Sequence, residues 1–145
     1  MFKKASFATL ALVLLSPPAL ARNTIADHAI KNALAHPKAE QVLGHDIKFF
    51  FGKQPHGKVA KDIGNFRTNQ KTNAFGKSDE AACQWAFLSA MKSLRQRAEA
   101  EGGNAVINIR SNYQNSLSTS EDSYKCGAGT VMAGVALVGD VVVIK

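Results

Sequence analysis

The sequence predicts an α+β fold in which one long helix packs across a small mixed or antiparallel sheet, with short helices near the N-terminus. Three observations support this prediction. Residues 78–103 carry an apolar stripe at helical spacing between a serine and two glycines. Segments of alternating or aromatic residues flank this helix on both sides. Residues 130–144 are rich in valine and broken by glycine, which is typical of buried strands.

Apolar spacing, proline and glycine predict the first elements. Apolar residues recur at helical spacing over 25–43, which predicts one or two short helices interrupted at Pro37 and closed by Gly44. The aromatic run 47–51 predicts a strand. Residues 54–57, with the sequence Gln-Pro-His-Gly, predict a turn.

A second strand should follow this turn. We expect residues 59–68 to pair with the aromatic strand and to kink at Gly64. Residues 69–77 are polar and contain two asparagines and a glycine, so we expect a loop.

The long helix is the clearest element of the sequence. Ser78 can accept a hydrogen bond from a free backbone N–H as the N-cap residue. Asp79 and Glu80 place negative charge in the first turn, where the helix dipole favours it. Gly102 and Gly103 end the helix. One apolar stripe runs along it, formed by Cys83, Phe87, Met91, Leu94 and Ala98.

Three strands are expected after the long helix. Residues 104–110 alternate as a strand does, residues 112–122 form a polar loop, and residues 123–126 begin the next strand. Residues 130–144 predict one bent strand or two short buried strands, because β-branched residues dominate and glycines interrupt them. The expected order is helix, two strands, long helix and three strands.

The first 21 residues have the composition of a secretory signal peptide. Lys3 and Lys4 precede a short apolar run, and Ala19 and Ala21 supply the small residues of a cleavage site. We expect residues 22–145 to form one domain that is periplasmic or secreted after cleavage behind Ala21. The alternative is a membrane anchor or a buried helix, but the apolar run is short for a membrane span. No cysteine follows Ala21, so no lipid anchor is expected there.

The chain contains two cysteines, Cys83 and Cys126. An even pair in an exported chain most simply forms one disulfide. Closing a loop of about 40 residues would stabilise the fold by roughly 3–4 kcal/mol on the chain-entropy model. The alternative is a reactive thiol pair, although the spacing matches neither C-x-x-C nor a zinc pattern.

The expected mature chain is basic, and its charge is uneven. It keeps all but Lys3 and Lys4 of the 18 lysines and arginines, against 11 acidic residues, for a formal charge of +5. Residues 48–77 hold seven cations against Asp62 alone, which favours anionic partners such as lipid head groups, lipopolysaccharide, acidic polymers or an acidic protein face. The alternative is a solvated basic surface without a ligand. The best candidate contact residues are Lys71, Lys77, Arg67 and Lys58.

No motif supports an enzyme, a metal site or a cofactor. Gly76-Lys77-Ser78 matches the end of a Walker A loop, but Lys71 stands where the first glycine belongs, so we expect no nucleotide. The start of the helix beside Lys71 and Lys77 could hold a simple anion. None of the four histidines is spaced for a metal site, and neither cysteine has an obvious base in the sequence. We expect no catalytic residue and no nucleic-acid partner.

The second half of the chain resembles a known exported domain. A long helix ending in Glu-Gly-Gly, then Asn104-Ala105-Val106 and a Cys-Gly-rich Val/Ala strand, is similar to the domain of the Rcs-phosphorelay outer-membrane lipoprotein and to YbjQ-like α/β domains. The segment TNAFGKSDEAACQWAF resembles small exported bacterial proteins of unknown role that often carry the label "excinuclease ATPase subunit". The lipoprotein resemblance implies that Cys83 and Cys126 staple the domain. This chain lacks the lipid-attachment cysteine and the proline-rich tether, so anchoring and phosphorelay signalling do not carry over.

These observations favour a non-enzymatic periplasmic domain. Its basic region 48–77 would bind an anionic ligand or an envelope protein partner. The domain would then serve as a binding module or as an envelope-stress accessory domain. One alternative is a small thiol-dependent or hydrolytic enzyme. Another is a self-assembling structural subunit whose valine-rich final strand pairs edge to edge.

Overall fold

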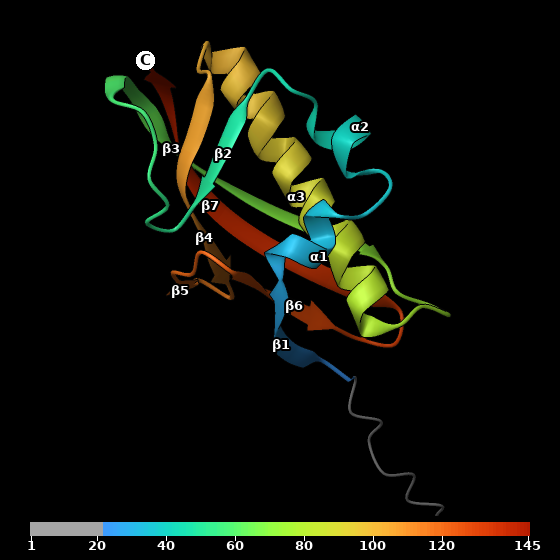
Figure 1. Cartoon of the computed structure of the whole chain (residues 1–145). Helices are drawn as coiled ribbons and strands as arrows, with labels where there is room; N and C mark the ends of the chain where they lie inside the picture. Colours follow the sequence, from blue (N-terminus) through green and yellow to red (C-terminus); the bar gives the residue numbers. More distant parts are fainter. Residues whose placement is uncertain (1–21) are drawn as a thin grey trace, which may run out of the picture.

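The computed structural model describes residues 22–145 (Figure 1), and the signal peptide expected at 1–21 lies outside the described residues. One sheet of seven strands carries a long helix across one face, which confirms the α+β prediction. The elements in chain order are β1 (Thr24–Ala29), α1 (Ile30–Leu34), α2 (Ala39–Leu43), β2 (Lys48–Phe51), β3 (Val59–Asn73), α3 (Asp79–Glu101), β4 (Ala105–Tyr113), β5 (Ser116–Ser118), β6 (Ser123–Ala128) and β7 (Met132–Ile144).

Strand β7 lies in the middle of the sheet. It pairs antiparallel with β3 along one edge, and with β4 and then β6 along the other. Strand β2 runs parallel to β4, so the sheet is mixed. Strand β5 pairs with β4 and β1 pairs with β6, both antiparallel. The other edge of β3 pairs with no strand among residues 22–145.

The long helix begins and ends where the sequence predicts. The Ser78 hydroxyl accepts a hydrogen bond from the Ala81 backbone N–H at 3.1 Å. Gly102 adopts a left-handed backbone (φ +78°), a conformation that glycine reaches without steric cost. The whole predicted apolar stripe of α3 is buried against the sheet, at Cys83, Phe87, Met91, Leu94 and Ala98.

Alternation along β7 separates the two faces of the sheet. Its odd-numbered residues join the hydrophobic core with α3, as Val135, Leu137 and Val141 show. Its even-numbered residues point away from α3. The helices gather on one side of the sheet, and the other face carries no helix (Figure 1). The sheet therefore has one covered and one open face.

A disulfide between Cys83 and Cys126 ties α3 to β6, as predicted, and leaves no free cysteine. Its Cα atoms are 5.9 Å apart, and both residues are fully buried on the covered face. A disulfide fits an oxidising, extracytoplasmic location. A free reactive thiol pair is therefore the wrong description of this structure.

The N-terminal segment differs from the prediction. Residues 24–29 form strand β1, in which Asp27 lies opposite Lys125 of β6, and the two side chains pair at 2.8 Å. Helices α1 and α2 are each five residues long. The helical spacing of apolar residues over 25–43 was misleading because β6 offers a free edge on which β1 completes the sheet.

The pairing of β3 also differs from the prediction. This strand continues to Asn73, through the expected loop, and it pairs with β7 rather than with the aromatic strand. The 13-residue β7 offers a longer partner than the four-residue β2 does. Residues 130–144 supply this one continuous strand, which has partners on both sides. Within residues 22–145 the final strand therefore has no free edge for edge-to-edge pairing.

The buried tyrosine Tyr124 provides a test of this core. Its ring stacks on Phe87 with centroids 4.3 Å apart, and its hydroxyl is buried without a hydrogen-bond partner among the described residues. A buried hydroxyl without a partner loses its hydrogen bonds to water and forms none in the protein, so it destabilises the folded state. We expect Tyr124→Phe to raise the free energy of unfolding by about 1 kcal/mol at neutral pH, measured by urea denaturation.

Urea denaturation of the wild type and of Tyr124→Phe at high pH is the control for this experiment. Burial, with a smaller contribution from Glu80, raises the pKa of Tyr124. The folded state therefore opposes ionisation, and the wild type should lose stability as the pH rises above about 10, the ordinary tyrosine value. The variant should lack this part of the loss. A less stable variant at neutral pH would show that the hydroxyl has a partner after all.

Candidate ligand-binding face of the sheet

Strand β3 presents a row of amides and cations on the open face. Its odd-numbered side chains from 65 to 73 are all exposed, whereas the even-numbered ones are partly or fully buried toward α3. Alternate residues of a strand share a face, so the exposed side chains form one row. We call it the β3 row, and it consists of Asn65, Arg67, Asn69, Lys71 and Asn73.

Register across the sheet places other strands beside this row. Arg67 lies opposite Val138 of β7, and Val138 lies opposite Arg110 of β4. Directly opposite residues share a face, so two arginines flank Val138. Val138 is only 2% exposed although no helix covers it. The apolar stems of arginine side chains can cover such a neighbour.

Two adjoining hollows lie on this face. The larger has a volume of about 550 Å³ and the smaller about 250 Å³, and Asn69 and Gln114 line both. Lys71 lines the larger hollow and Arg67 the smaller. The other polar residues that line the two hollows are the amides Asn23, Asn112 and Asn115, together with Arg22, Tyr113, Thr68 and Thr130.

The Tyr113 side chain lies across the floor of the larger hollow. Its hydroxyl donates to the Asn23 side-chain oxygen at 3.3 Å. Gly127 makes room for it, because a Cβ at this position would collide with the tyrosine hydroxyl. At Gly134 the atoms nearest to such a Cβ are the Lys71 Cγ at 3.6 Å, the Gln70 carbonyl oxygen at 3.8 Å and the tyrosine ring at 3.9 Å. The ring therefore lies between the β3 row and β6.

The cations of this face differ in how much of their charge is free. Arg22 donates to Asp79 at 2.9 and 3.0 Å, and this hydrogen bonding lowers the pKa of Asp79. Arg67 and Lys71 form no ion pair with any residue from 22 to 145. Their charges are available to an incoming anion.

The structure separates the four basic residues that the sequence proposed. Arg67 and Lys71 share the open face and line the hollows. Lys77 lies in the loop before α3, where its ammonium donates to the Asn73 carbonyl at 3.1 Å. Lys58 precedes β3 at the other end of that strand. Neither Lys77 nor Lys58 lines the two hollows.

Most of the other residues of the face were not predicted. The amides of Asn69 and Gln114 and the ring of Tyr113 did not stand out, because the sequence placed 69–77 and 112–122 in loops. The alternation of asparagine with arginine and lysine over 65–73 was the available signal. To recognise this pattern, the predicted strand 59–68 would have had to continue for five more residues, to Asn73.

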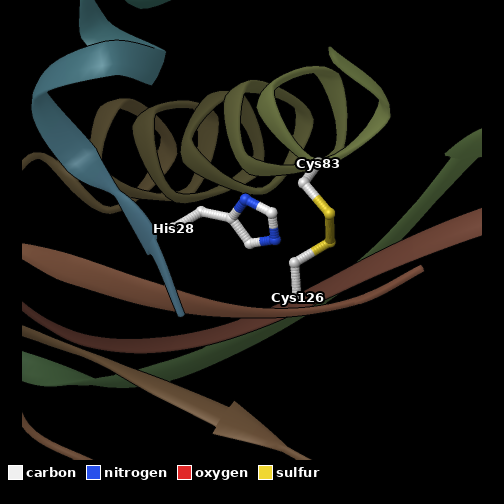
Figure 2. Close-up of side chains that lie close together, drawn as sticks. All are labelled: His28, Cys83 and Cys126. Carbon is white, nitrogen blue, oxygen red and sulfur yellow. A yellow bond between two sulfur atoms is a disulfide. The ribbon is translucent and has the colours of Figure 1, made fainter. Parts of the chain in front are cut away.

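A histidine lies beside the disulfide on the covered face, although the sequence suggested no base near either cysteine. Figure 2 shows the His28 imidazole from β1 pointing toward the bond between Cys83 and Cys126. One ring nitrogen and both sulfur atoms lie within 4.8 Å of one another. This cluster is the one group of three or more such donors within residues 22–145.

No protein-family model, no curated protein and no solved structure matches this chain. Among the helices of residues 22–145, none has the length and the apolar composition that crossing a membrane requires.

Replacement of the floor glycines tests the position of Tyr113. Gly127→Ala should push the tyrosine ring out of the hollow and break its bond to Asn23, because the new methyl group takes the place of the hydroxyl. Gly134→Ala is the matched control, since its methyl group meets only ordinary contacts. We expect the Tyr113 ring resonances to move in the first variant and to stay in place in the second, measured by NMR. Equal spectra would contradict this placement.

Proposed function

We propose that this protein is a non-enzymatic binding module that holds an anionic ligand of the cell envelope, or an acidic envelope protein, on the open face of its sheet. The observation that carries the proposal is the β3 row, in which Arg67 and Lys71 have no acidic partner and face two adjoining hollows. The proposed binding site therefore lies on strand β3, and it does not extend over the whole basic region 48–77.

The geometry suits an extended ligand with separated negative charges. Arg67 and Lys71 are four residues apart on one strand, which corresponds to roughly 13 Å. Asn69 stands between them and, with Gln114, offers donors and acceptors for hydroxyl or carbonyl groups. Phosphate or carboxylate groups at this spacing along a glycan or a lipid assembly would meet both cations.

Asp140, the acidic residue opposite the β3 row, does not neutralise the cations of that row. Asp140 accepts hydrogen bonds from the Asn65 amide at 2.7 Å and from the Asn108 amide at 3.4 Å. These amides satisfy its oxygens, and it lies at the end of the face away from Lys71, opposite Asn65. An anionic ligand would therefore meet net positive charge along Arg67 and Lys71.

Location in the envelope is part of the proposal. The buried disulfide supports it, because such bonds persist in oxidising compartments. The proposal of export and of cleavage behind Ala21 rests on the sequence of the first 21 residues alone. The proposal of a role as an envelope-stress accessory domain rests on the resemblance to the Rcs lipoprotein domain alone.

The experiment compares two charge reversals of equal size. Arg67→Glu with Lys71→Glu changes the open face, whereas Lys58→Glu with Lys77→Glu changes exposed residues outside the hollows. We expect the wild type to bind purified lipopolysaccharide or phosphatidylglycerol vesicles in a salt-sensitive way, measured by sedimentation. The first double variant should lose at least tenfold in affinity and the second should lose little.

The outcomes separate the alternatives. Equal losses in both double variants would indicate attraction by net charge without a site on the open face. Capture of an acidic envelope protein by the wild type, but not by the face variant, would identify a protein as the ligand. Absence of salt-sensitive binding to any of these partners would contradict the proposal.

A further inference from the structure

We propose that reduction of the disulfide converts His28, Cys83 and Cys126 into a binding site for a soft divalent metal ion, with Zn²⁺ as the best fit. In the oxidised protein the two sulfur atoms are bonded to each other and are poor ligands. The reduced pair would supply two thiolates, and the imidazole would supply a nitrogen. This site lies on the covered face and is independent of the proposed ligand face.

The donors already lie at nearly the required separations. One histidine nitrogen and both sulfur atoms fall within 4.8 Å of one another, and the two cysteine Cα atoms are 5.9 Å apart. Zinc binds thiolate at about 2.3 Å and imidazole at about 2.0 Å, so tetrahedral ligands lie roughly 3.5–4 Å from one another. Small side-chain rotations would therefore suffice after the S–S bond opens.

Three elements hold these donors in place. His28 comes from β1, Cys83 from α3 and Cys126 from β6 (Figure 2). The His28 ring stacks on Tyr124 with centroids 5.8 Å apart, and Tyr124 in turn stacks on Phe87. This aromatic packing fixes the direction of the imidazole. His28 is partly exposed, so a small ion has a path to the buried sulfur atoms.

Nearby acidic residues favour a cation at this position. Asp79 and Glu80 begin α3, one helical turn before Cys83. The pKa of Asp79 is lowered chiefly by the Arg22 hydrogen bond, and His28 contributes to the lowering, so the two side chains are within electrostatic reach. Glu80 makes a smaller contribution than burial to raising the pKa of Tyr124, whose ring stacks on His28. Neither carboxylate is required as a ligand.

The chemistry balances with a dithiol as the reductant. Two electrons and two protons from the dithiol open the Cys83–Cys126 bond and give two thiols, and the dithiol becomes a cyclic disulfide. Binding of Zn²⁺ then releases the two thiol protons, and His28 binds as the neutral imidazole. Three protein ligands leave one zinc position for water. Strand β6 would therefore be linked to α3 by the disulfide in the oxidised protein and by the bound metal in the reduced protein.

The test uses the mature chain reduced with a phosphine under argon, since a phosphine adds no competing thiol. Titration with Co²⁺, and then displacement by Zn²⁺, reports thiolate ligands through their charge-transfer absorption. We expect one equivalent to bind the reduced wild type and none to bind the oxidised protein. His28→Gln should weaken binding at least tenfold. His45→Gln, which changes an exposed histidine elsewhere, is the matched control.

Circular dichroism of the same samples covers the case in which reduction unfolds the chain. Zn²⁺ should then restore the native spectrum, or raise the melting temperature if the reduced chain stays folded. Three results would each overturn the proposal. They are absence of a thiolate band in the reduced wild type, equal affinity of His28→Gln and wild type, and a reduced chain that stays unfolded with Zn²⁺. All of these results are independent of anion binding on the open face.

Discussion

The packing of α3 on one face of β7 determines where the rest of the molecule lies. Strand β7 has partners along both edges, so only its two faces remain for other elements. One face takes the apolar stripe of α3 and the disulfide, and it forms the core with Val135, Leu137 and Val141. The other face is then left to polar side chains, and the β3 row occupies it.

This division also separates the two kinds of chemistry in the protein. The sulfur atoms and His28 lie between the helix and the sheet, in a buried and aromatic environment. The free cations Arg67 and Lys71 lie on the opposite side, in contact with solvent. A change in the oxidation state of the cysteines would therefore leave the charge of the open face unaltered, and an anion there would not approach the sulfur atoms.

Local signals predicted part of this structure, whereas long-range pairing could not be predicted. The prediction of helix α3 was correct because its signals are local. Its caps at Ser78 and Gly102 and its apolar stripe depend only on residues that are close in the sequence. Strand partners depend on the whole sheet, and so the pairing of β3 with β7 and the conversion of 25–29 to a strand were missed. Arg67 and Lys71 were chosen from charge alone. His28 was overlooked because 55 residues separate it from Cys83 in the sequence, and only folding brings them together.

Residue-resolved NMR of the oxidised domain can show directly whether an anionic ligand binds to the open face of the sheet. The amide signals of residues 22–145 would be followed while the phosphorylated core oligosaccharide of lipopolysaccharide is added at low and at physiological salt. We expect the chemical-shift changes to gather on residues 65–73 and 112–114, to be absent from α3, and to become smaller as salt is added. Shifts that gather on α3 or around 48–58, or no shifts at low salt, would contradict this expectation.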